Sequence, residues 1–293
     1  MFIVDAKGGL GNQMYQYALY RSLQEQGREA TLCLLHYERA QSDANTRIVA
    51  HGRRFLLEDI CRVRVDCAKT EDVFRLGSVK TDFFSKVLRK LGLYKSTHIR
   101  EEVAGYPSME WILSHKQAFL DGYWQDFAYS ASIESQLREE LTFKTPLEGK
   151  NREIAEQMAA CNAVSIHVRL NDYLSVPMYQ IQPKEYFTRA VEYISERVDN
   201  PVFYCFSDDI DWCREAFKDK NVTFVDWNTG ADSYRDMQLM SLCRHNIVTN
   251  STFSIWAAWL NANPDKIVVR PRHYFSEGHR DHEFAWPSDW IIR

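Results

Sequence analysis

The chain has 293 residues, 45% hydrophobic and 26% charged, which is an ordinary globular composition with material for one large or two smaller domains. Its net charge of −4 gives no global basis for nucleic-acid binding, so any phosphate recognition must come from a few placed cations. The seven cysteines are odd in number and form no C-x-x-C pair, and no apolar run nears the ~20 residues that span a bilayer. We therefore expect reduced thiols and a cytoplasmic protein.

The first half opens with a predicted strand over residues 2–6. Asp5 and Lys7 interrupt this apolar stretch, so we expect no signal peptide. The further elements predicted in this half are a helix over 12–26, strands over 30–35 and 117–121, and a helix near 130–141. Residues 40–115 are irregular and carry no motif.

A glycine-rich loop, residues 7–13 (KGGLGNQ), directly follows the first strand. Its glycines allow a sharp turn and a close approach to a ligand, and the helix that follows offers unpaired N–H groups. Met14 stands where a dinucleotide fingerprint would have its third glycine, so that type of site is not supported. A tight strand-to-helix turn is enough to explain the glycines. The adjacent amides of Asn12 and Gln13 instead favour a hydroxyl-rich or phosphate ligand.

Residues 81–95 are basic and amphipathic, a pattern that suits an anionic membrane surface but is more often a packed surface helix with solvated lysines. Residues 142–152 are polar and contain Pro and Gly, which predicts a domain boundary. We place the domains at 1–148 and 149–293.

The second half alternates predicted strands with predicted helices, which indicates a parallel sheet wound with helices. The predicted strands cover 163–168, 201–206, 222–226, 245–249 and 266–270, and the predicted helices cover 183–197, 208–217, 232–243 and 252–262.

The motif HVRLND directly follows the strand at 163–168. Alternate residues leaving a strand point the same way, so His167 and Arg169 should reach one site. The arginine fork of donors matches phosphate oxygens, and Asp172 is placed to hold that fork. A structural salt bridge at a strand end is the alternative.

Two further motifs follow later strands. Asp209 and Asp211 form a D-x-D that could hold a divalent metal with nucleotide phosphates, but an acidic first turn capped by Ser207 or Asp208 explains them better. Residues 250–254 (NSTFS) place three hydroxyls at a helix start, which exceeds the needs of capping and favours a phosphate site.

Together these motifs resemble the bacterial α-1,2-fucosyltransferase family nearly end to end. The resemblance is carried, in chain order, by residues 8–14, 122–125, 167–173, 206–209 and 240–256. It implies a GT-B fold, an α/β architecture of two Rossmann-like domains facing across a cleft, with an acceptor-side first domain and a donor-binding second domain.

The resemblance also implies transfer of L-fucose from GDP-fucose to the 2-hydroxyl of a terminal galactose, with inversion and without a metal or other cofactor. It implies that Arg169 binds the donor diphosphate, that His167 lies by the nucleotide and that Asp236 pairs with guanine. It further implies that Ser251 and Thr252 hold phosphate, and we expect Phe253 and Gly11 at the donor site with them. We expect Asn12 at the reacting centre, in contact with phosphate or acceptor. Asp172 is a candidate base; the alternatives are that it only orients Arg169 and that a leaving phosphate oxygen takes the proton. The partners are then GDP-fucose and a galactose-terminated acceptor, with no nucleic acid and with peripheral membrane association left open.

Two of the departures from the family pattern lie in the second motif; others lie near Ile255 and Ala257, where a tryptophan and a glycine are usual. Leu170 replaces a usual second arginine. Asn171 stands where glycine is usual, although Asn tolerates positive φ. The first departure leaves open a nucleotide-sugar-binding module without turnover. A metal-dependent transferase that uses Asp209 and Asp211 is also open and, more remotely, so is a dehydrogenase.

Overall fold

The computed structural model describes residues 1–42, 54–277 and 284–293, and leaves the side chains of residues 39–42 and Asp172 undescribed. The chain divides into two compact units, Met1–Lys144 and Thr145–Arg293, whereas the boundary predicted from the sequence lies slightly later, between 148 and 149. None of the described helices is both long and apolar enough to cross a bilayer.

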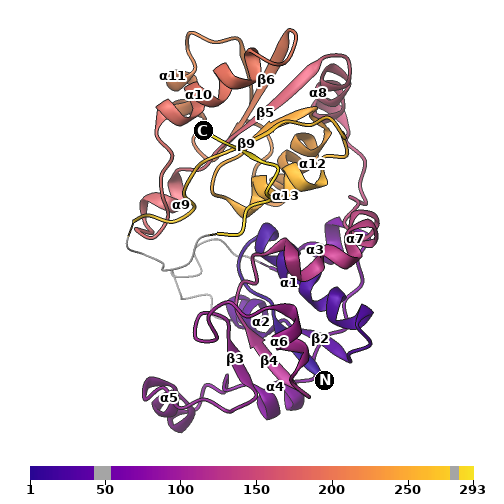
Figure 1. Ribbon diagram of the computed structural model, residues 1–293, viewed down its shortest axis with the longest axis vertical. Coiled ribbons are helices and arrows are strands. Elements are labelled where there is room, and N and C mark those ends of the chain that lie inside the picture. Colours follow the sequence, from indigo (N-terminus) through magenta and orange to yellow (C-terminus); the bar gives the residue numbers. More distant parts are fainter. Residues whose placement is uncertain (43–53, 278–283) are drawn as a thin grey trace. The chain divides into compact units, whose positions relative to one another are not determined.

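The first unit is built on a parallel sheet of four strands in the order β2-β1-β4-β3 (Figure 1). The strands are β1 (Phe2–Asp5), β2 (Ala30–Cys33), β3 (His98–Arg100) and β4 (Ala118–Asp121). Phe2, Ile3 and Val4 are wholly buried, as a central parallel strand covered on both faces requires. Of these four strands, β3 has no counterpart among the predicted ones, because three residues are too few to form a pattern.

The helices of this unit include the predicted long helix after β1 and a series of short ones. They are α1 (Leu10–Glu25), α2 (Leu35–Ser42), α3 (Leu57–Ile60), α4 (Thr70–Leu76), α5 (Phe83–Lys90), α6 (Met109–Leu113), the 3₁₀ turn η1 (Phe127–Ile133) and α7 (Glu134–Glu140). The irregular middle of the sequence therefore corresponds to helices of eight residues or fewer in the part that is described.

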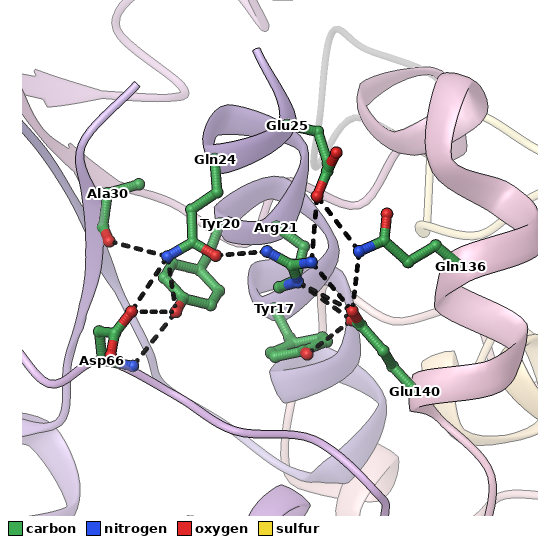
Figure 2. Close-up of polar contacts among 9 residues, drawn as sticks. All are labelled: Tyr17, Tyr20, Arg21, Gln24, Glu25, Ala30, Asp66, Gln136 and Glu140. Atoms are coloured by element: carbon green, nitrogen blue, oxygen red, sulfur yellow. Dashed lines mark hydrogen bonds and ion pairs between the residues drawn. The ribbon is translucent and has the colours of Figure 1, made fainter. Parts of the chain in front are cut away.

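A polar network on α1 ties this unit together (Figure 2). The Arg21 Nε donates to both carboxylate oxygens of Glu140 at 3.1 Å, and the Tyr17 hydroxyl donates to the same carboxylate at 2.7 Å. On the other side of α1, the Gln24 amide donates to Tyr20 and to Asp66. The network joins α7 and the loop at Asp66 to α1, so its role is structural.

The second unit is built on a six-stranded parallel sheet in the order β10-β9-β8-β5-β6-β7. Its strands are β5 (Asn162–Val168), β6 (Pro201–Ser207), β7 (Val222–Val225), β8 (His245–Ile247), β9 (Val268–Arg270) and β10 (Ile291–Ile292). Counted along this unit, the spatial order is 3-2-1-4-5-6, that of a doubly wound dinucleotide-binding sheet. The strand order reverses between β5 and β8, and such a switch point is where ligands bind in open α/β sheets.

Helices cover both faces of this second sheet (Figure 1). They are α8 (Gly149–Ala159), α9 (Asn171–Leu174), α10 (Lys184–Ser195), α11 (Ile210–Ala216), the turn η2 (Gly230–Asp232), α12 (Tyr234–Leu242) and α13 (Thr252–Leu260). On β5, Val164, Ile166 and Val168 belong to the core with residues of α10 and α11. Because side chains alternate along a strand, His167 points to the other face, toward α13. The predicted α/β class with two parallel sheets is confirmed.

Candidate functional site

The carboxyl ends of β5 and β8 lie side by side in the second unit and bring two sequence motifs together. Residues 167–173 run from the end of β5 into α9, and residues 249–254 run from the loop after β8 into the first turn of α13. Ser251 is the N-cap residue of α13, but its hydroxyl makes no capping hydrogen bond to the first turn of the helix. The Tyr173 hydroxyl donates to the Asn250 carbonyl at 2.7 Å and fixes the two segments to each other.

His167 lies in the centre of this junction. It is 4% exposed, its Nδ1 lies 3.1 Å from the Thr249 hydroxyl, and its ring centre lies 5.8 Å from that of Phe253. Burial, reinforced by the charge of Arg169, lowers the pKa of His167 to about 3. The imidazole is therefore neutral near pH 7, and it can supply hydrogen bonds but no positive charge.

Arg169 supplies the positive charge at this site. Its side chain is 28% exposed, and its Nε lies 3.3 Å from Oδ2 of Asp208, which follows β6. The same Asp208 carboxylate accepts the backbone N–H groups of Leu170 at 2.9 Å and Asn171 at 3.2 Å. Asp208 thus holds both the loop after β5 and the guanidinium. The sequence prediction gave this role to Asp172, whose side chain lies outside the described part.

The structure explains the first departure from the family pattern, Leu170, but not the second, Asn171. Leu170 is 7% exposed and packs in the core with Val168 and Tyr186. This position therefore has a packing role and supplies no positive charge to the site. Asn171 begins α9 and is absent from the described non-glycine residues with positive φ, so positive φ does not explain its presence.

The acidic run after β6 is used for local structure. Asp209 is the N-cap of α11 and its carboxylate accepts the Trp212 N–H at 3.0 Å, while the Ser207 hydroxyl accepts the Asp209 N–H at 2.9 Å. The prediction of an acidic first turn is confirmed, although the cap is Asp209 rather than Ser207 or Asp208. Within the described ranges no group of three His, Cys, Asp or Glu residues could hold a metal ion.

Asp236 lies in the first turn of α12, the helix that packs beside α13. The Asn228 amide donates to Asp236 Oδ1 at 2.8 Å, and Asn228 in turn exchanges hydrogen bonds with Asn151 at 2.8 and 2.9 Å. Burial raises the pKa of Asp236 to about 7, against the opposing effect of the Asn228 hydrogen bond. The carboxyl is therefore poised to gain or lose a proton near neutrality.

The glycine loop of the first unit fixes the direction of one amide. Gly8 has φ +84°, and a Cβ at Gly8 would lie 2.5 Å from Asn12 Nδ2, so glycine is required there on both counts. Gln125 Nε2 donates to Asn12 Oδ1 at 2.8 Å. The oxygen of the Asn12 amide is therefore engaged within the unit, and its nitrogen is the group that could donate to a ligand. Gly11 lies in the first turn of α1, beside it.

Gln13, the second amide of this loop, has a structural role. It is 1% exposed, donates to the Arg54 carbonyl at 3.0 Å and accepts the Leu56 N–H at 2.8 Å. The prediction that both amides serve a ligand is thus wrong for Gln13, which holds the segment before α3.

The motif at 122–125 is shaped by Glu101, a residue that the sequence prediction missed. Its buried carboxylate accepts the N–H groups of Tyr123 at 2.8 Å and Trp124 at 3.0 Å, and a Cβ on Gly122 would lie 2.5 Å from the Glu101 Cβ. This packing permits only glycine at 122 and delivers Gln125 to Asn12. Glu101 lies in the irregular middle of the sequence, where no pattern marks it.

A charged cluster lies at the carboxyl ends of β1 and β4, directly before the glycine loop. Lys7 Nζ pairs with Asp121, whose other oxygen lies 3.2 Å from His98 Nε2. Burial opposes ionisation of Asp121, but His98 and Lys7 hold its pKa well below its ordinary value. Burial raises the pKa of neighbouring Asp5 to about 6, despite the nearby Lys7.

Comparison of the sequence with known proteins identifies the family of the chain. The model of glycosyl transferase family 11 matches residues 71–293. The chain is 32% identical over 294 residues to the O-antigen biosynthesis glycosyltransferase WbnK of Escherichia coli, covering 92% of this chain and 93% of that protein.

Other relatives include an alpha-1,2-colitosyltransferase of Escherichia coli, 28% identical over 309 residues with 99% of both chains covered. The human galactoside alpha-(1,2)-fucosyltransferase 1 is 27% identical over 154 residues, which cover 48% of this chain and 42% of that protein. Among solved structures, the NodZ alpha-1,6-fucosyltransferase soaked with GDP-fucose aligns with a TM-score of 0.49 at 13% identity, covering 98% of this chain and 99% of that one. The family match spans most of the sequence, and the chain therefore belongs to glycosyl transferase family 11.

Proposed function

We propose that the protein transfers L-fucose from GDP-fucose to the 2-hydroxyl of a terminal galactose, with inversion at the anomeric carbon and without a metal ion. Family 11 membership supports glycosyl transfer. The name of the human relative supports both the galactoside acceptor and the α-1,2 linkage.

The observation that carries the proposal is the position of Arg169 at the switch point of the second sheet. Asp208 holds its Nε side, and the neutral His167 and the start of α13 lie at the same junction. A guanidinium fork and the N–H groups of a helix start are the donors that a diphosphate needs. Ser251, Thr252 and Phe253, at this helix start, complete the proposed phosphate site.

Asp236 is the proposed guanine contact. A carboxylate accepts the N1 and N2 hydrogens of guanine together, a pair of donors that adenine and uracil do not offer. Its place in the first turn of α12, beside α13, puts this acceptor within the same unit as the proposed phosphate site.

The proposed reaction is a single displacement. The galactose 2-oxygen forms a bond to the fucose anomeric carbon while the bond from that carbon to the GDP oxygen breaks and its electron pair leaves with GDP. Arg169 and the α13 N–H groups stabilise the charge that develops on the diphosphate. The acceptor proton passes to a base, for which we propose Asp172. In the first unit, we propose that Asn12 donates to the acceptor through its amide nitrogen.

One comparison supports a second candidate for the sugar that is transferred. The relative named alpha-1,2-colitosyltransferase matches 99% of this chain, so colitose in place of fucose is the alternative sugar. The metal-dependent alternative is not favoured, because Asp209 is committed to capping α11.

Arg169→Ala tests the diphosphate role directly. Loss of one donor to a developing oxyanion typically costs about 10²–10³ in kcat, so we expect a fall of that size with the fold intact by circular dichroism. The matched control is Arg214→Ala in the same unit, since Arg214 is half exposed and pairs with Asp226 at 2.7 Å. Activity of Arg169→Ala within about tenfold of wild type, only ~1.4 kcal/mol, would reject the role.

A further inference from the structure

The segment around α5 in the first unit is an amphipathic helix with its apolar side turned outward. At 100° per residue, the apolar positions 83, 84, 87, 88 and 91 share one arc, and the polar positions 85, 86, 89 and 90 share the other. Phe83 is 84% exposed, Phe84 69%, Leu91 67% and Leu93 57%. None of the α5 residues is buried, and Figure 1 shows α5 standing apart from the sheet of its unit.

This exposure is concentrated rather than scattered. Of the eight large hydrophobic side chains that are exposed in the described ranges, four lie between 83 and 93. Single exposed apolar residues need no explanation, but a contiguous group marks an interaction surface. The sequence expectation of a packed surface helix is therefore wrong for the apolar side, although Lys86 and Lys90 are solvated as expected.

The orientation of the helix is held by its own polar contacts. Arg89 Nη1 donates to the carbonyls of Ser78 at 3.0 Å and Lys80 at 2.6 Å. The Asp82 carboxylate caps the helix by accepting the Ser85 N–H at 2.9 Å, and Lys95 Nζ donates to the Arg75 carbonyl at 3.0 Å. The Arg89 bonds attach the polar arc of α5 to the loop before the helix, and the exposed Phe83 and Phe84 lie on the other arc.

The charge of the segment identifies what can cover it. Residues 80–95 contain five basic side chains and a single acidic one, whereas the whole chain carries −4. A second copy of the chain on this face would bring two basic surfaces together, which repel each other. A purely apolar partner would offer the lysines no negative charge to pair with. An anionic lipid surface takes both, since phenylalanines enter the acyl boundary and lysines meet the headgroups.

We propose that α5 and the turn after it, as far as Leu93, bind the surface of an anionic phospholipid bilayer. Phe83, Phe84, Leu91 and Leu93 enter the interface, while Lys80, Lys86 and Lys90 lie at headgroup level. The attachment is peripheral and depends on salt, because its electrostatic part is screened within about 8–10 Å at physiological ionic strength.

Flotation of the full chain with vesicles tests this proposal. The vesicles are phosphatidylcholine alone or phosphatidylcholine with about one third phosphatidylglycerol, and no nucleotide sugar is present, so the result is independent of the proposed transferase reaction. We expect binding to the anionic vesicles only, weakened by added salt. The double variants Phe83→Ser/Phe84→Ser and Lys86→Glu/Lys90→Glu should each lose binding by about tenfold or more.

Val103→Ser is the matched control, because Val103 is 69% exposed in the same unit but lies outside the segment. It should bind as the wild type does, and all variants should keep the wild-type melting temperature. Equal partition into neutral and anionic vesicles, or wild-type binding by both double variants, would overturn the proposal. So would a lipid-free dimer that Phe83→Ser/Phe84→Ser converts to monomer, because a second copy would then cover the face.

Discussion

At the scale of single residues, the proposed donor site separates charge from hydrogen bonding. Arg169 supplies a permanent charge, whereas the buried His167 is neutral and Asp236 changes its charge near pH 7. Asp208 is a positioning residue, since it acts through Arg169 and the backbone of residues 170 and 171. This division predicts that GDP binding responds to pH through Asp236 rather than through His167.

GDP affinity should rise with pH across the range from 6 to 8. Only the carboxylate form of Asp236 can accept both guanine hydrogens, and with a pKa of about 7 that form is the minority at pH 6. The apparent dissociation constant scales with the inverse of the competent fraction, so it should fall about tenfold over this range. Isothermal titration calorimetry at a series of pH values measures it.

Asp236→Asn is the control that separates this effect from ionisation of the GDP phosphate itself. The variant should bind GDP more weakly and keep only the pH dependence of the ligand. A raised carboxyl pKa adds stability that is complete below the ordinary value of 3.8 and is lost as pH rises through about 7. Asp236→Asn should therefore melt higher than wild type at pH 8. Identical GDP pH profiles for the two proteins would contradict the guanine contact.

At the scale of elements, polar side chains in the first unit link helices that lie far apart in the sequence. The Arg21–Glu140 pair joins α1 to α7 across 119 residues of sequence (Figure 2). Burial disfavours the Glu140 carboxylate, but Arg21 and Tyr17 outweigh it and lower its pKa below the ordinary 4.5. Its contribution to stability is therefore complete above pH 4.5 and is lost as pH falls below that value.

Glu140→Gln should lower the free energy of unfolding by about 1–3 kcal/mol at pH 7, because hydrogen bonds to a charged group are lost. The difference from wild type should shrink as the pH falls toward 3. Glu134→Gln on the same helix is the control: Glu134 is half exposed and pairs with Arg138 one turn away, so its loss should cost at most about 0.5 kcal/mol. Urea unfolding of both variants measures the difference, and equal losses would contradict a special role for the α1–α7 link.

At the scale of the whole molecule, the regular strand–helix alternation made the two sheets predictable. The strands at 163–168 and 201–206 match β5 and β6 within one residue, because long apolar runs bounded by polar loops have few other interpretations. The short helices α3, α4 and α6 and the strand β3 were not predictable, since three to seven residues carry too little periodicity.

The site was predictable only where a motif adjoins a strand end. His167, Arg169 and residues 251–253 were proposed in this way, and the structure brings them to neighbouring strand ends. Asp208 and Glu101 were missed as positioning residues, because their partners are backbone N–H groups fixed only by the fold. The outward face of α5 was also missed, since a sequence pattern gives an apolar arc but not the direction in which it points.

The most direct test of the account is release of GDP from GDP-fucose, with and without lactose, in the presence of EDTA, with the product linkage read by NMR. A parallel reaction offers GDP-linked colitose as donor. We predict lactose-dependent GDP release that gives fucose α-1,2-linked to galactose and is lost in Arg169→Ala. Saturable GDP binding with no turnover on lactose or on an array of galactose-terminated acceptors, or activity that EDTA abolishes, would contradict the proposed function.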